Sequence, residues 1–229
     1  MNNQRILSKI TGFSILIMAL LAVFTFGYAS PKLFDYNQPD IAQNLTENLN
    51  LYKFMLLGIL VIILLDFLLS YTLYLYFKNL NNKLALLSFY FRVSYTLLFC
   101  LSAYFLLKNI AETNNVIIIQ NYNSFEFVWS IGLIFFGIHI FILGLLIWIH
   151  KSIPKLLGYL TIFGGISYVL VHILKTTFTD LTELTSLLNT ILALPMALGE
   201  LGLAIWLIVK GGRLENSRNY NSNNLSECL

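Results

Sequence analysis

The sequence predicts an all-α membrane protein, a polytopic bundle of six transmembrane helices with both termini in the cytoplasm. The 229 residues are 58% hydrophobic and only 11% charged, whereas soluble domains are roughly 45–50% apolar and about 25% charged. The mean hydropathy is +0.75. The apolar residues also fall into six runs, each close to the ~20 residues that a helix needs to cross a bilayer. We therefore expect residues 1–211 to form a single transmembrane domain.

The first predicted span, residues 10–29, follows Arg5 and Lys9 as the apolar core of a secretory signal would. A signal core is only ~7–15 residues long, so this longer run is expected to be a retained helix. The connection from Pro31 to Lys53 is the most polar internal stretch. It is expected to be exposed and to contain a short helix near its end.

Five further spans are predicted at residues 54–77, 84–107, 127–149, 156–178 and 187–209. In the connection before the fourth span, Val116–Ile119 is apolar but too short to cross a bilayer. This segment is expected to be interfacial or re-entrant. The Asn- and Ser-rich tail, residues 212–229, is expected to be disordered and cytoplasmic.

Orientation is predicted from lysine and arginine, which are enriched on the cytoplasmic side of membrane proteins. With the N-terminus inside, the cytoplasmic side carries Arg5, Lys9, Lys78, Lys83, Lys151, Lys155, Lys210, Arg213 and Arg218. The opposite side carries Lys32, Lys53, Lys108 and Lys175. An even number of spans returns the C-terminus to the cytoplasm.

Several function classes are excluded. The formal net charge of +3 is small and its signs are scattered, so no nucleic acid is expected as a partner. Cys100 and Cys228 match neither a disulfide framework nor a metal site. Catalytic signatures such as HExxH, GxSxG and a phosphate-binding glycine loop are absent. We expect a non-catalytic protein with no cofactor and no metal, whose partner is the lipid bilayer; homo-oligomers are compatible with this composition.

Polar and small residues recur at helical spacing within the spans, and we expect them to mark the inner face of each helix. These residues are Asp66, Ser70 and Tyr74; Ser88, Arg92, Thr96 and Cys100; Gly132 and His139; Thr161, Gly165, Tyr168, His172 and Thr176; and Asn189, Ala193, Met196 and Glu200. Small residues let helices approach closely and polar ones bond between helices. For the uncharged members, helix packing is the expected role.

Asp66, Arg92 and Glu200 need compensation, because a charged side chain at a helix centre costs about 2.5–3.5 kcal/mol on insertion scales. At a rise of ~1.5 Å per residue, Arg92 and Glu200 lie at similar depth, with Asp66 within reach of the arginine. We predict that these three form a cluster in the bundle interior. It has two interpretations: a structural link between three helices, or a proton- or ligand-responsive site that carries excess negative charge.

His139 and His172 complete the candidate polar cluster. Histidines on neighbouring helices can ligate haem iron, but at the helical rise these two differ in depth by roughly 9 Å, so paired ligation is not expected. Near Glu200, Pro195 leaves two alternatives open: an ordinary proline kink, or the interrupted span that transporters use.

Three stretches resemble the bacterial membrane family DUF4386: Lys83–Leu87 with Phe91–Val93, Lys151–Tyr159, and Gly199–Leu201 with Ile205–Gly211. The resemblance implies the same topology and signature positions at Arg92, Ser152 with Pro154, and Glu200 with Trp206 and Lys210. Where the family carries a Glu after the arginine, this chain has Ser94, so Asp66 is the candidate replacement. The family has no established activity.

The sequence therefore predicts an uncharacterised integral protein of the bacterial inner membrane that acts without catalysis, through a partner or in envelope homeostasis. The alternative is a small transporter or a lipid- or small-molecule-binding protein that uses the cluster of Asp66, Arg92 and Glu200. The absence of motifs and the short loops fit the first interpretation, whereas the buried charges and the proline in the sixth span fit the alternative.

Overall fold

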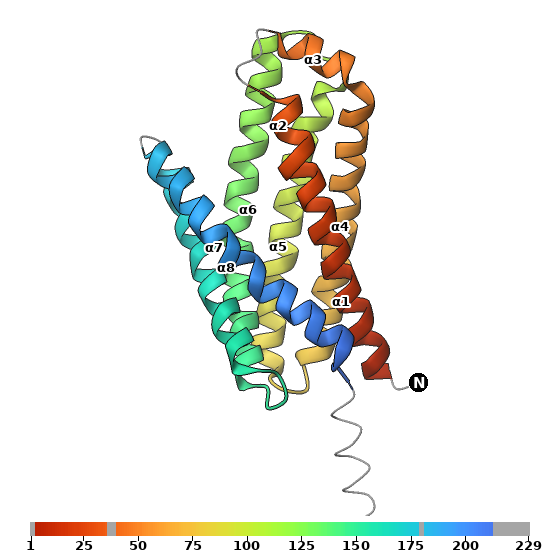
Figure 1. Ribbon diagram of the computed structural model, residues 1–229, viewed down its shortest axis with the longest axis vertical. Coiled ribbons are helices and arrows are strands. Elements are labelled where there is room, and N and C mark those ends of the chain that lie inside the picture. The colour runs from red at the N-terminus through yellow and green to blue at the C-terminus, as the bar shows by residue number, and fades with distance from the viewer. Residues whose placement is uncertain (1–2, 36–39, 179–180, 213–229) are drawn as a thin grey trace, which may run out of the picture.

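The computed structural model describes residues 3–35, 40–178 and 181–212. The all-helical prediction is confirmed, because the described residues contain six helices that are long and apolar enough to cross a membrane, and no strand. Figure 1 shows these helices as an elongated bundle. The expected disordered tail lies outside the described residues, apart from Gly212.

The first span, Asn3–Leu33, combines three segments: α1 (Asn3–Ala22), a π-helical segment (Val23–Ala29) and α2 (Ser30–Leu33). Pro31 is tolerated because it occupies the first turn of α2, where its missing N–H has no helical partner to lose. The wider π-helical turns lie about two thirds of the way along this span. Such turns are found mostly as single insertions in α-helices and often at functional sites.

A short helix, α3 (Ile41–Glu47), precedes the second span, as predicted. Asp40 caps α3, because its side-chain oxygen accepts a hydrogen bond from the backbone N–H of Gln43 at 3.0 Å. This bond, followed by one from the Asn115 side chain, holds the pKa of the Asp40 carboxyl below its ordinary value.

The remaining spans are α4 (Leu49–Phe77), α5 (Asn82–Leu107), α6 (Asn115–Ile149), α7 (Lys155–Thr177) and α8 (Thr182–Val209). A 3-10 turn, Lys108–Ala111, extends α5. Asn81 begins α5 by accepting a hydrogen bond from the backbone N–H of Leu84 at 3.1 Å. Pro154 directly precedes α7, where a residue without an N–H loses no helical bond.

Of the two alternatives predicted for Val116–Ile119, interfacial or re-entrant, the re-entrant one is wrong. These residues form the first turns of α6, which begins twelve positions before the predicted start of the fourth span at residue 127. Asn114 caps the helix, accepting a hydrogen bond from the N–H of Val116 at 2.9 Å. Ile118 is fully buried, whereas Val116 and Ile117 are exposed, so one side of this turn joins the bundle core.

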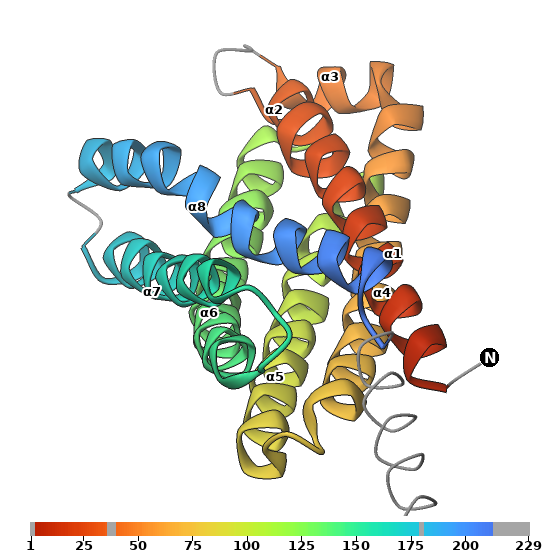
Figure 2. The same cartoon turned by 60° about the horizontal axis from the view of Figure 1, so that its bottom comes forward.

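The helices pack in a ring-like order along the chain (Figures 1 and 2). α6 lies between α5 and α7, and α8 packs on α7 and, towards its C-terminal end, on α1. Arg5 joins the two ends of the chain by donating hydrogen bonds to three carbonyl oxygens at the end of α8, those of Leu207, Ile208 and Gly211. Residues near both termini therefore lie at the same end of the bundle.

The first half of α8 follows α7 away from the other helices (Figures 1 and 2). As a result Asn189 and Ala193 are exposed, and the expectation that they face the bundle interior is wrong. Only the lower part of that stripe, from Met196 to Glu200, turns towards the core. The helix is also continuous through Pro195, which excludes the interrupted span that was one of the two alternatives.

Candidate functional site

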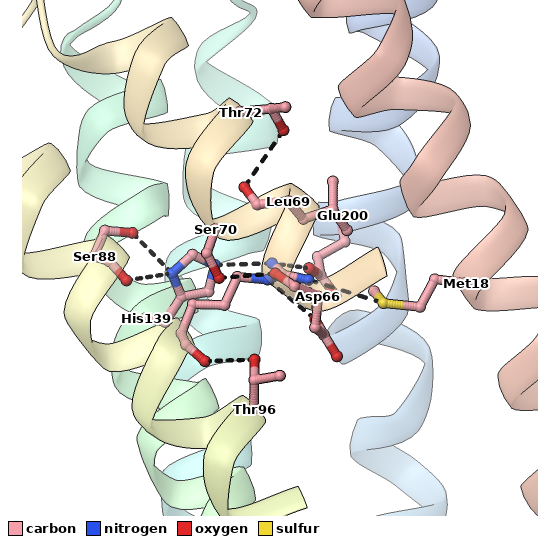
Figure 3. Close-up of polar contacts among 10 residues, drawn as sticks. Met18, Asp66, Leu69, Ser70, Thr72, Ser88, Thr96, His139 and Glu200 are labelled. Atoms are coloured by element: carbon pink, nitrogen blue, oxygen red, sulfur yellow. Dashed lines mark hydrogen bonds and ion pairs between the residues drawn. The ribbon is translucent and has the colours of Figure 1, made fainter. Parts of the chain in front are cut away.

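Four helices bring charged and polar side chains together in the bundle interior (Figure 3). Arg92 of α5 is fully buried. Its Nη2 and Nε lie 2.6 Å and 3.1 Å from Oδ1 of Asp66, which comes from α4. Because two guanidinium N–H groups converge on one carboxylate oxygen, Asp66 is the principal partner of Arg92.

Glu200 of α8 is the second acidic group at the cluster. Its Oε1 lies 3.7 Å from Nη1 of Arg92. That distance permits an ion pair but is too long for a hydrogen bond. The side chain is 13% exposed, whereas that of Asp66 is 1% exposed. Glu200 is therefore the more loosely held carboxylate and the one nearer to open space.

His139 of α6 completes the cluster from the other side. Its Nε2 lies 3.0 Å from Nη1 of Arg92. Since a guanidinium only donates, this nitrogen must accept. The proton then belongs on Nδ1, which faces the carbonyl oxygen of Ser88 at 3.0 Å and the Ser88 hydroxyl at 2.8 Å. Both nitrogens are engaged, and the imidazole is neutral.

With both carboxylates ionised the cluster has a net negative charge, because one guanidinium faces two carboxylates. Among the described residues, Oδ2 of Asp66 and Oε1 of Glu200 are buried without a hydrogen-bond donor. Buried carboxylate oxygens without a donor are costly. The arrangement therefore favours the arrival of a proton, a cation or another hydrogen-bond donor at the cluster.

A cavity of about 290 Å³ lies against Glu200, between the first span and helices α6, α7 and α8. Its lining is mostly apolar and includes five aromatic residues: Phe26, Tyr95, Trp129, Phe136 and Tyr168. Phe26 comes from the π-helical segment and stacks on Trp129, with ring centroids 4.3 Å apart. Arg92 lies over the Phe136 ring, 5.4 Å from its centroid, so the charged cluster adjoins the aromatic wall.

The sequence did not single out Phe26, Trp129 or Phe136. The available signal was spacing: Trp129 and Phe136 are seven residues apart and so share one face of α6. In an apolar span that spacing is common, which is why it did not indicate a cavity.

His172 is not part of this cluster. Its Nδ1 lies 3.3 Å from the hydroxyl of Ser130, and it lines a different cavity of about 420 Å³ together with Lys175. Because the nitrogens of His139 are both engaged and His172 has other partners, the two do not form a pair of ligands. Within residues 3–35, 40–178 and 181–212, no three His, Cys, Asp or Glu side chains are grouped to hold a metal ion.

These features define a multi-pass helical membrane protein with a charged cluster beside an apolar cavity. A family described as a domain of unknown function, DUF4386, matches residues 10–211, and the chain belongs to this family. An uncharacterized protein of Archaeoglobus fulgidus is 26% identical over 167 residues, covering 73% of this chain and 90% of the relative. No solved structure matches the chain.

Proposed function

We propose that this protein is a non-catalytic component of the cytoplasmic membrane that binds a small hydrophobic molecule drawn from the bilayer. The observation that carries the proposal is the cavity of about 290 Å³ that ends on Glu200, whose Oε1 is buried without a hydrogen-bond donor. Ligand sites are typically apolar pockets with a few placed polar groups. This cavity has that composition, at the small end of the usual ~300–1,000 Å³ range.

Access from the lipid supports the proposal. The cavity lies between α1 and α8, and its rim includes Val23, which is 69% exposed in the isolated chain. Since α1 and α8 both belong to predicted membrane spans, a side chain exposed at this level faces acyl chains. A hydrophobic molecule can therefore reach the cavity laterally without crossing water.

The depth of Glu200 also fits a ligand that dissolves in the bilayer. Glu200 is ten residues before Lys210 at the end of α8, which corresponds to ~15 Å along the helix. That is about half the ~30 Å thickness of the hydrocarbon core. With the positive residues of the helix ends in the cytoplasm, the polar end of the ligand would lie near the membrane centre.

The cluster has two parts with separate roles in this proposal. Arg92 donates hydrogen bonds to Asp66 and His139 and thereby links α4, α5 and α6, which is a structural role. Glu200 contributes one long ion pair to this network and lines the cavity. We assign Glu200 to the ligand.

The test is equilibrium dialysis of a neutral apolar probe, phenethyl-tert-butane, against the purified protein in lipid nanodiscs, with empty nanodiscs as the reference. We expect saturable binding beyond partition into lipid. Ala197→Phe, which fills the cavity from α8, should abolish it. Ala193→Phe, one turn away and exposed to lipid, should leave it intact. Equal binding by both variants, or no saturable binding, would refute the proposal.

A further inference from the structure

The cavity beside Glu200 combines aromatic walls with a carboxylate that has one long ion pair and no hydrogen-bond donor on its Oε1. This combination narrows the class of ligand. Resting on the function proposed above, we infer that the ligand is a lipophilic organic cation, an amine or a quaternary ammonium, held between the aromatic rings and the Glu200 carboxylate.

The charge of the cluster is the first argument. Asp66 receives two N–H groups of Arg92, at 2.6 Å and 3.1 Å, whereas Glu200 has only the longer ion pair to Nη1, at 3.7 Å. With both carboxylates ionised, the excess negative charge lies on the one that lines the cavity. In a low-dielectric site this charge repels an anionic ligand and attracts a cation.

The aromatic residues are the second argument. A cation within ~6 Å of a ring face is attracted by the ring quadrupole, most strongly by Trp, and recognition of quaternary ammonium groups uses several rings at once. Phe26, Tyr95, Trp129 and Tyr168 line the cavity with Phe136. Among the described residues, one cationic side chain lies over a ring of this lining: Arg92, over Phe136.

Rings of this kind also fit the apolar remainder of such a ligand. The neighbouring rings pack at close range, with Tyr95 and Phe136 4.8 Å apart and Phe136 and Tyr168 5.2 Å apart between centroids. The contact between Phe136 and Tyr168 is perpendicular, with an interplanar angle of 90°. A rigid wall of this type costs little side-chain entropy when a ligand is bound.

The test compares two probes of the same shape in the dialysis assay: phenethyltrimethylammonium and the neutral phenethyl-tert-butane, in which a carbon replaces the charged nitrogen. We expect the cation to bind at least about tenfold more tightly than the neutral probe, since the Glu200 carboxylate attracts the cation in a low-dielectric site and the rings add a smaller attraction.

Three variants locate the source of the preference. Glu200→Gln keeps the shape but removes the charge, and it should bring the two affinities to within about threefold. Trp129→Leu should weaken the cation more than the neutral probe. Glu183→Gln removes an exposed carboxylate in the first turn of α8 and should change neither.

The outcomes separate the two proposals. If the neutral probe binds in the cavity as well as the cation does, the ligand class is wrong while the proposed function stands. A cation preference that survives Glu200→Gln also overturns the inference. If neither probe binds saturably, the proposed function itself is wrong.

Discussion

Arg92 is held by side chains from four other helices. Asp66 of α4 and His139 of α6 receive its hydrogen bonds, Glu200 of α8 forms a longer ion pair, and Nη2 lies 3.9 Å from the sulfur of Met18 in α1. A fully buried guanidinium in an apolar environment is tolerated only when its charge and its donors are both matched. The two carboxylates in turn depend on Arg92 for stability, because they are buried and it supplies their positive partner.

At the scale of single residues, we predict that Arg92→Met lowers the free energy of unfolding by about 3–5 kcal/mol, because it leaves the Asp66 carboxylate buried without its partner. Adding Asp66→Leu should restore most of this loss, since the unpaired charge is removed with it. Equilibrium unfolding in mixed micelles measures both variants. A double variant no more stable than Arg92→Met would show that charge compensation is not the reason for the pair.

At the scale of whole helices, the close packing of α7 against α6 depends on glycine residues. A Cβ atom at Gly165 of α7 would lie 2.4 Å from the backbone nitrogen of Phe141 and 2.7 Å from the carbonyl oxygen of Gly137, both in α6. These neighbours are backbone atoms that cannot move aside without shifting a helix. The close approach brings α7 against α6 and thereby fixes Tyr168, one turn above Gly165, at the wall of the cavity.

We predict that Gly165→Ala destabilises the protein by about 1–3 kcal/mol, the usual cost of overpacking. Gly27→Ala is the matched control, since its Cβ would meet nothing closer than 3.9 Å. That control should be neutral or stabilising by up to about 1 kcal/mol, because alanine is the better helix former. Thermal unfolding followed by intrinsic fluorescence compares the two, and an equal effect of both changes would exclude close packing as the cause.

The first and last spans meet at one end of the molecule. Arg5 and Ser8 of α1 both donate to the carbonyl oxygen of Gly211, at 2.8 Å and 3.0 Å, where the end of α8 leaves carbonyls without helical partners. Above this contact α1 and α8 diverge (Figures 1 and 2), and the cavity beside Glu200 lies between them and α6 and α7. The contact of α1 with the end of α8 and the cavity between the two helices therefore result from the same crossing of α1 and α8.

For the whole molecule, we predict that both chain ends lie in the cytoplasm, because the lysines and arginines gather at their end of the bundle. In a Cys100→Ser, Cys228→Ser background, Asn79→Cys should react with a membrane-impermeant maleimide only after the cells are permeabilised. Thr113→Cys, exposed at the opposite end, should react in intact cells. The reverse pattern of labelling would invert the assigned orientation.

Much of the architecture could be predicted from the hydrophobicity of single residues and from polar residues spaced one helical turn apart. The stripe of Asp66 and Ser70 is buried, as is that of Ser88, Arg92 and Thr96, because a polar group in a span must turn away from lipid. The same rule was wrong for Asn189 and Ala193, since it assumes that every span is surrounded by neighbours. The first half of α8 packs on α7 alone and leaves that face exposed.

The sequence by itself determined that the chain enters a membrane, that it has six spans, and that Asp66, Arg92 and Glu200 require partners. These features can be predicted without knowledge of packing, because hydrophobicity is summed over residues adjacent in the sequence and the cost of burying a charge belongs to the charged residue itself. Only the tertiary structure decided that Asp66, 26 positions from Arg92, is its principal partner and that His139, 47 positions away, joins them while His172 does not. Those choices, and the cavity beside Glu200, depend on the rotation and tilt of helices against one another, which are set by contacts between residues far apart in the chain.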